Sequence, residues 1–450
     1  MIEYPSPHAN VKKNFSNFNS PETSDYLDLI EYPSPHANIK KNFPNFKSPA
    51  IADHLSSLKD GLNILDAYGL IDDCSIPTTY EARSMLWNYC LSVVGASLHA
   101  SQLLKEDKTD VAIHWGGGRH HAHSNCASGF CYVNDVVLAI HNLIRPCPTK
   151  SKDKQRVLYI DLDIHHSDGV QAEFYDTNQV LTVSMHRYAP GFFPSSSGSV
   201  NEKGQHGTMG VGYNLNIPMP RSCSNADFLE MFNGIVKKLV PEYKPHSLVL
   251  CVGADGLYDD TLVGDEGWCL SPECLAECVR IASLSCNEIV EHADILSSKY
   301  YSRTKLLVLG AGGYNEINTA RTFLLCTAAA CEGARPGMLW KELPKDIPNH
   351  SYFSRYGPQY LLHSAANLQR KKYGCITEDY NSCISAGQKA IQLAYLHLKK
   401  RNEPTKKFNL KNEKDFINTN FEKWMSLGEG RITRKVNLSG RRHKKKMKNK

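Results

Sequence analysis

The sequence predicts a single-domain α/β protein with a mostly parallel, multi-stranded sheet that carries helices on both faces. Short apolar runs alternate with helical stretches from about residue 51 onward. The runs are apolar at consecutive positions, which is typical of strands covered on both faces. Glycines and ionisable residues follow the ends of these runs. This alternation favours a doubly wound sheet with its functional site at the carboxyl ends of the strands.

The elements of the sheet follow in order along the chain. Five runs are expected to form buried strands, at residues 111–115, 157–160, 180–184, 248–252 and 306–309. Helical stretches separate several of them, for example residues 226–240 and 271–292. We expect the polar ends of these strands to converge on one crevice.

The composition excludes several classes of protein. The 450 residues are 41% hydrophobic and 22% charged, which is typical of a soluble globular enzyme and argues against wholesale disorder. No apolar run reaches the roughly 18 residues of a membrane-spanning helix, so we expect none. Residues 1–7 lack the basic and apolar regions of a signal peptide. The 15 cysteines form no Cys-x-x-Cys pair, so we expect thiols in a reducing, intracellular compartment.

The two ends of the chain differ from its body. Residues 2–18 recur at 30–46 with 15 of 17 positions identical. We expect residues 1–50 to be a poorly ordered extension, although an artefact of the gene model would explain the repeat equally well. The catalytic domain is expected over residues 51–400, and residues 401–450 should form a basic, disordered tail.

The basic charge is concentrated in that tail. Residues 431–450 hold ten Lys and Arg and no acidic residue, which leaves 42 basic and 46 acidic residues in the rest of the chain. Three interpretations of the tail stay open, namely nuclear import, contact with nucleic acid, and a solvated terminus without a dedicated partner.

Two of the strand ends offer metal ligands. Asp163 and His165 stand two residues apart after the second run, so their side chains leave the backbone on the same side. Asp255 follows the fourth run. Two carboxylates and one imidazole with one open position form the ligand pattern of a catalytic zinc site. Taken singly, Asp163 is more often a capping carboxylate and His165 a core histidine.

Two further features point to catalysis. His120 and His121 follow the first run, and each needs a carboxylate such as Asp161 or Asp168 to fix its tautomer. A His–Asp pair is the usual form of a tuned general base. Tyr314 follows a glycine-rich loop, where its phenol could donate a hydrogen bond to a developing oxyanion. Surface histidines and an exposed turn tyrosine are the alternatives.

These motifs together resemble the class I zinc-dependent histone deacetylases. The matching stretches are GGGRHHAHSNCASGFCYVN at 116–134, VLYIDLDIHHSDGV at 157–170, PGFFP at 190–194, residues 253–255, and LGAGGYNEINTAR at 309–321. The stretch IPNHSYFSRYGP at 347–358 and the pair Asp73-Cys74 are most similar to the histone deacetylase 8 branch. The resemblance covers roughly residues 70–375.

The resemblance implies the arginase/deacetylase-like fold and the hydrolysis of N-ε-acetyl-lysine to lysine and acetate. A water activated by Zn²⁺ would attack the acetyl carbonyl, and Fe²⁺ would also tolerate the ligand set. His121 would act as general base and acid, with electrostatic help from His120. The implied catalytic residues are His121, His120, Tyr314, Asp161 and Asp168, and the implied metal ligands are Asp163, His165 and Asp255.

The resemblance also implies a substrate site and monovalent cation sites. Phe130 and Phe193 would wall a narrow tunnel for the lysine methylenes, and Asp73 would grip the substrate backbone. The implied substrate-binding residues are Asp73, Gly129, Phe130, Phe193, Leu262 and Tyr314. K⁺ would bind at positions matching Asp161, Asp163, His165, Ser184 and Met185, and again at Phe174, Thr177, Val180 and Tyr213.

Several positions depart from the family's pattern. Ser167, Ala311 and Asp259 stand where the family has glycine, and His123-Ser124 replaces a basic pair. If position 311 requires a positive φ, the loop before Tyr314 is strained. About 20 extra residues, rich in Cys and Ser, lie between Asp255 and Tyr314. The family's first strand and early helices are not recognisable in residues 1–70.

The function that follows is a protein lysine deacetylase. Its partners would be acetylated histone tails, other acetyl-lysine proteins and chromatin-associated complexes, with no membrane, and with nucleic acid bound only through the tail. We expect it in the nucleus and the cytoplasm. The alternatives are an acetylpolyamine amidohydrolase and a catalytically impaired deacetylase-like scaffold.

Overall fold

The structure is a computed structural model that describes most of the central part of the chain. It describes residue 74 and residues 80–146, 155–287, 289–293, 299–334, 340–363 and 377–402. All of them belong to one unit, Met1–Thr405. The repeat in residues 1–50, Asp73 and the basic tail from residue 403 onward lie outside the described residues, so the expectations for them stay predictions.

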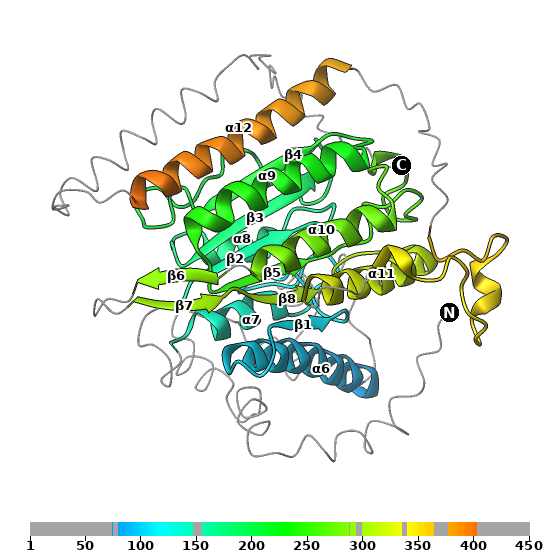
Figure 1. The fold of residues 1–450 in the computed structure, drawn as a ribbon. Coiled ribbons are helices and arrows are strands. Elements are labelled where there is room, and N and C mark those ends of the chain that lie inside the picture. The colour runs from blue at the N-terminus through cyan, green and yellow to red at the C-terminus, as the bar shows by residue number, and fades with distance from the viewer. Residues whose placement is uncertain are drawn as a thin grey trace, which may run out of the picture. The chain divides into compact units, whose positions relative to one another are not determined.

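A six-stranded sheet forms the centre of the fold, and every pair of neighbouring strands in it is parallel (Figure 1). In spatial order its strands are β1 (Val111–His114), β8 (Lys305–Leu309), β5 (Ser247–Cys251), β2 (Val157–Asp161), β3 (Val180–Arg187) and β4 (Asn214–Met219). The predicted fold class is therefore confirmed, and the five predicted strands are β1, β2, β3, β5 and β8.

The register of the sheet brings the ends of its strands level. Leu309 is paired with both His114 and Cys251, and Asp161 is paired with both Cys251 and Ser184. These five residues form one row across β1, β8, β5, β2 and β3. The loops that follow β1, β8, β5 and β2 therefore leave the sheet side by side.

Helices cover both faces of the sheet because the strand residues alternate between two hydrophobic clusters. Leu158 and Ile160 of β2 pack into one cluster, and Val157 and Tyr159 pack into the other. The first cluster contains residues of α9 (Asn225–Tyr243), α10 (Pro272–Cys286), α11 (Glu316–Ala334) and α12 (Thr377–Asn402). The second contains residues of α6 (Tyr80–Lys105), α7 (Asp135–Ile144) and α8 (Asp168–Phe174). In Figure 1, α9 and α10 lie in front of the strands.

The structure corrects the sequence analysis in two places. The predicted helix at 271–292 is too long, because α10 ends at Cys286 and residues 289–293 form strand β6 (Ile289–Ala293). β6 pairs with β7 (Lys299–Arg303) in an antiparallel hairpin just before β8. The β-branched Ile289 and Val290 suit a strand better than a helix.

The edge strand β4 was not predicted. Apolar residues alternate along it with Asn214 and Asn216, so it lacks the continuous apolar run of a central strand. It also contains Pro218, which is acceptable at a sheet edge. Three short 3₁₀ helices complete the described elements, at Gly264–Glu266, Trp340–Glu342 and Phe353–Tyr356. None of the helices in the described ranges is long and apolar enough to cross a membrane.

Candidate active site

The candidate site lies where the loops after β1, β2, β5 and β8 meet. Asp163 and His165 follow β2, Asp255 follows β5, Tyr314 follows β8, and the two adjacent histidines 120 and 121 follow β1. Because the registers end these strands in one row, residues far apart in the sequence become neighbours. The structure thus brings the predicted metal ligands and the predicted catalytic residues to the same edge of the sheet.

Asp163, His165 and Asp255 offer ligand atoms that all lie within 4.8 Å of one another. Nδ1 of His165 lies 3.1 Å from Oδ1 of Asp163 and 2.9 Å from Oδ2 of Asp255. Backbone N–H groups hold both carboxylates, since Gly312 donates to Asp163 over 2.8 Å and Ile164 donates to Asp255 over 3.1 Å. The donor set of two carboxylates and one imidazole is therefore fixed in place before any ion binds.

Close packing of glycines keeps these carboxylates in position. A Cβ atom on Gly312 would lie 2.4 Å from Oδ2 of Asp255 and 2.9 Å from Oδ2 of Asp163. A Cβ atom on Gly253 would lie 2.3 Å from Oδ2 of Asp163. Backbone without side chains thus lies directly against the predicted metal-ligating atoms, which restricts the movement of the two carboxylates.

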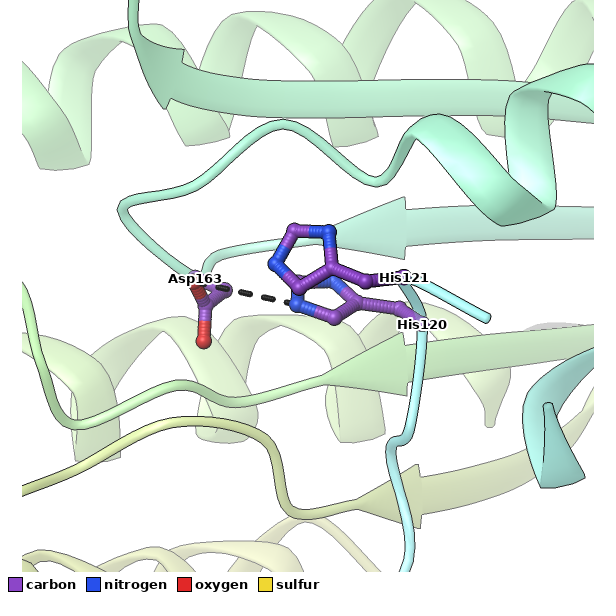
Figure 2. A group of neighbouring side chains, drawn as sticks. All are labelled: His120, His121 and Asp163. Carbon is purple, nitrogen blue, oxygen red and sulfur yellow. Dashed lines mark ion pairs between the residues drawn. The ribbon is translucent and has the colours of Figure 1, made fainter. Parts of the chain in front are cut away.

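Two His–Asp pairs stand beside this ligand set. Nδ1 of His120 lies 2.6 Å from Oδ2 of Asp161, and Nδ1 of His121 lies 2.7 Å from Oδ1 of Asp168. An ionised carboxylate only accepts hydrogen bonds, so Nδ1 of each imidazole carries the hydrogen and Nε2 faces away from its carboxylate. Figure 2 shows the two imidazoles on one loop, with Nε2 of His120 turned to Asp163, 3.9 Å from its Oδ1.

The surroundings drive the pKa values of the two adjacent histidines apart. Burial and the neighbouring His120 lower the pKa of His121 to about 4. Burial would lower that of His120 as well, but the charges of Asp161 and Asp163 outweigh it and raise its pKa to about 9. At neutral pH the imidazole of His121 is therefore a neutral proton acceptor, and that of His120 is a buried cation.

The metal-ligand set itself attracts a cation. Burial opposes a charge on His165, but Asp163 and Asp255 outweigh burial and raise the pKa of His165 to about 10. Burial and the charge of Asp163 raise the pKa of Asp255 to about 7. His165 therefore holds a proton between two carboxylates when no metal is bound, and a divalent ion would take the place of that positive charge.

Apolar side chains are exposed around His121 and Tyr314. Phe130, Phe193 and Leu262 are 47%, 37% and 50% exposed. The ring of Phe193 meets that of His121 edge-on, with centroids 4.9 Å apart, and the ring of Phe130 lies 6.0 Å from that of Tyr314. Burial and the charge of Asp163 raise the pKa of Tyr314 far above its usual range, so its phenol stays a neutral donor.

Gly129 lies against the histidine that is predicted to be the base. Its φ is +53°, and a Cβ atom there would lie 2.4 Å from Cδ2 of His121. Only glycine fits this contact in this conformation. The structure therefore gives Gly129 a packing reason that the sequence alone does not contain.

The departures from the family's pattern have different structural consequences. Ala311 is not among the described residues with positive φ, so the condition under which alanine would strain the Tyr314 loop is not met. Ser167 has a φ of −78°, which any residue adopts. Asp259 does have a positive φ, +67°, a conformation that Asp tolerates better than most residues.

One further histidine, which the sequence did not identify as part of the site, lies beside the predicted base. Nε2 of His123 lies 3.1 Å from Oδ2 of Asp168, whose other oxygen faces His121. One carboxylate thus joins a buried histidine to a partly exposed one. The signal was available as the third histidine of His120-His121-Ala122-His123, but only the fold shows that it shares Asp168.

The positions matched to K⁺ sites fall into two groups around β2 and β3. Asp161 and Ser184 are paired across these strands, and Met185 follows on β3. Thr177 donates its backbone N–H to the carbonyl of Phe174 over 3.4 Å just before Val180 begins β3, and Tyr213 precedes β4.

Comparison with known proteins finds histone deacetylases both among family models and among individual relatives. The chain matches the family model of the histone deacetylase domain over residues 23–330. It is 35% identical over 300 residues to histone deacetylase 8 of Xenopus laevis, which covers 66% of this chain and 77% of the frog protein.

Plant proteins match it at similar levels. Histone deacetylase 3 of Oryza sativa subsp. japonica is 38% identical over 282 residues, or 63% of this chain and 48% of the rice protein. Histone deacetylase 6 of Arabidopsis thaliana is 36% identical over 278 residues, or 62% of this chain and 51% of the Arabidopsis protein. Because frog and plant relatives are similarly identical to the chain, its assignment to one branch stays a prediction.

Proposed function

The chain belongs to the histone deacetylase family, and from this premise we propose that a zinc ion held by Asp163, His165 and Asp255 supports its hydrolysis of acetyl-lysine amides. The observation that carries this proposal is the position of these ligand atoms, all within 4.8 Å of one another beside two His–Asp pairs. Three protein ligands and one open position are the arrangement of catalytic zinc sites.

The donor set fits zinc on chemical grounds. Zn²⁺ accepts carboxylate oxygen and imidazole nitrogen, and Fe²⁺ tolerates the same ligands. The raised pKa of His165, about 10, reflects the negative charge that the two carboxylates direct at its Nδ1. A bound zinc ion would polarise the acetyl carbonyl and make an attacking water more acidic.

The residues of the chain then move the protons. His121 is neutral at pH 7, and its Nε2 accepts the proton of the water that attacks the carbonyl carbon. As the C–N bond breaks, the same nitrogen returns that proton to the leaving Nζ of lysine. Asp168 keeps the hydrogen on Nδ1, 2.7 Å away, so Nε2 stays available. Tyr314 donates its phenol hydrogen to the carbonyl oxygen as negative charge develops there.

The exposed apolar residues beside the site suit a long aliphatic side chain. Phe130 and Phe193 flank the approach to His121 and Tyr314 and would pack against the lysine methylenes. We propose acetylated histone tails as substrates and K⁺ as a structural ion at the positions matched above. Nucleus and cytoplasm are the proposed locations, based on the basic tail. No observation favours an acetylpolyamine amidohydrolase or an inactive scaffold.

An assay of the full chain with an acetyl-lysine peptide tests this function. We expect zinc-loaded protein to release acetate and lysine, and a chelator to abolish turnover reversibly. The Asp163→Ala variant should bind less zinc than the parent. A hydroxamate should raise the melting temperature of the zinc-loaded parent by binding only the folded protein. Turnover that survives complete removal of metal would overturn the zinc proposal.

A further inference from the structure

We propose that Asp260 and Thr261 are positioning residues that clamp the backbone of Tyr314 and so hold its phenol in place for the reaction. This inference rests on the proposed function, because it concerns how the tyrosine is aimed. It is carried by hydrogen bonds between two loops, the Asp255 loop (residues 255–266) and the Tyr314 loop (residues 310–315). Neither residue has a role in the site as described so far.

Both polar groups of the Tyr314 backbone are held by the Asp255 loop. The N–H of Tyr314 donates to Oδ2 of Asp260 over 2.7 Å, and the carbonyl of Tyr314 accepts from Oγ1 of Thr261 over 2.7 Å. The next N–H, that of Asn315, donates to the same Oδ2 over 3.3 Å. Two neighbouring side chains thus fix the peptide units on either side of one Cα atom.

The other carboxylate oxygen of Asp260 also accepts backbone hydrogen bonds. Oδ1 accepts from the N–H groups of Leu262 and Val263 over 2.9 and 3.3 Å. The carboxylate therefore accepts four backbone hydrogen bonds while its residue is only 4% exposed. Hydrogen bonds to a buried carboxylate are among the stronger ones in proteins, so the clamp is a firm link between the two loops.

Tyr314 needs such a link because the loop before it is rich in glycine. Gly310, Gly312 and Gly313 precede Tyr314 in the chain, and Gly313 has a φ of +145°. Glycine-rich backbone loses more conformational freedom on ordering than other backbone does. The side chain of Tyr314 is 37% exposed, so packing alone does not fix its direction. An oxyanion donor acts only when it is held ready in the right place, and losing one typically lowers kcat by about 10²–10³-fold.

Substitutions of Thr261 and of Asp260 should have different effects on kcat and KM. Thr261 donates its hydroxyl to the carbonyl of Tyr314, whereas Asp260 also accepts from the backbone of Leu262, a predicted substrate contact. Thr261→Val, which removes the hydroxyl and keeps the shape, should lower kcat about tenfold with KM unchanged, the effect of one lost hydrogen bond. Asp260→Asn should lower kcat and raise KM. Thr261→Ser should keep the kcat of the parent.

A double-mutant cycle with Tyr314→Phe tests whether the clamp acts through the phenol. We expect Thr261→Val to lower kcat of the zinc-loaded full chain in the parent background and to have no further effect beside Tyr314→Phe. The matched control is Asp259→Asn, which removes a charge from the neighbouring, exposed side chain and suits its positive φ. This control should leave kcat unchanged.

Hydrogen exchange of the Tyr314 and Asn315 amides tests the clamp without any turnover. Both amides should be protected in the parent and should exchange faster in Asp260→Asn. An inactive zinc-loaded parent would overturn the proposed function, and the exchange measurement would still decide about the clamp. Unchanged exchange and unchanged kcat in both clamp variants would overturn the clamp, as would equal losses of kcat with and without the phenol. If Asp260→Asn does not fold, the effect of Thr261→Val on kcat, with and without the phenol, decides about the clamp.

Discussion

His120 and His121 show how two adjacent and identical side chains acquire opposite properties. His120 faces Asp161 and Asp163, and their charges raise its pKa to about 9. His121 pairs with Asp168, but burial together with its cationic neighbour lowers its pKa to about 4. The sequence shows only a dipeptide, but the fold makes one member a cation and the other a neutral base.

The assignment of the base can be tested directly. His121→Ala should lower kcat by about 10²–10⁴-fold, the usual contribution of general acid–base catalysis, and should leave zinc content near that of the parent. The matched control is His141→Ala, which breaks a different His–carboxylate pair, 2.8 Å long and only partly buried, with Glu173. Steady-state kinetics and metal analysis check both. An active His121→Ala variant would remove this residue from the mechanism.

His123 should matter through Asp168 rather than through substrate. His123→Leu removes the contact to Oδ2 of Asp168 and leaves that carboxylate freer to turn away from His121. We expect kcat to fall about fivefold to tenfold with KM unchanged, which corresponds to one ordinary hydrogen bond. His123→Gln, which keeps a donor, should recover most of that loss. Equal activity of the Leu and Gln variants would show that the contact has no role.

At the scale of elements, the site depends on how the strands end. The row of His114, Leu309, Cys251 and Asp161 starts four loops at the same level. Each loop then needs only two to seven residues to reach the ligand set or the catalytic residues. Glycines in these loops let neighbouring backbones approach the carboxylates, so we expect the conformation of the loops to affect metal binding.

Gly312→Ala tests that link. The added Cβ atom would lie 2.4 Å from Oδ2 of Asp255, so the carboxylate must shift, and zinc affinity should fall by at least tenfold. Competition with a zinc chelator measures the affinity. Gly95→Ala in α6 is the control, because its Cβ meets nothing within 4 Å and should stabilise the helix by up to about 1 kcal/mol. Unchanged zinc affinity in Gly312→Ala would contradict the close packing.

At the scale of the whole molecule, helices on both faces keep polar groups near the sheet away from water. His186 on β3 and His397 on α12 are examples that lie outside the metal-ligand set. Burial, with the neighbouring His166, lowers the pKa of His186 to about 3. Burial, with the charge of Arg401, lowers that of His397 to about 4. An unfolded histidine has a pKa near 6.5, so both residues link stability to pH.

This link predicts the start of acid unfolding. A histidine whose pKa is lowered in the folded state stabilises it above about pH 6.5, and that contribution is lost as pH falls toward the folded value. Between pH 6.5 and 4, each such residue should cost about 1.4 kcal/mol of unfolding free energy per pH unit. Urea unfolding of the metal-free protein at pH 7, 6 and 5 measures the slope.

His397→Gln should reduce that slope by about 1.4 kcal/mol per pH unit. A slope that is identical in the parent and in His397→Gln would show that His397 does not titrate differently in the folded and unfolded chain.

The sequence by itself determined the fold class, five of the six strands of the main sheet and the family, because continuous apolar runs and the residues that follow them are local signals. It also placed the candidate ligands Asp163, His165 and Asp255 at strand ends. It did not predict β4, whose alternating residues reflect its place at the edge, or the end of α10 before the β6–β7 hairpin.

Only the tertiary structure decided which side chains meet. Asp168 is shared by His121 and His123, and Asp260 holds the backbone of Tyr314, 54 residues further along the chain. Such contacts depend on strand order and register, which pair segments far apart in the sequence. The local sequence around Asp260 does not indicate that this carboxylate binds the glycine-rich loop. The two segments become neighbours only because β8 pairs with β5 in the sheet.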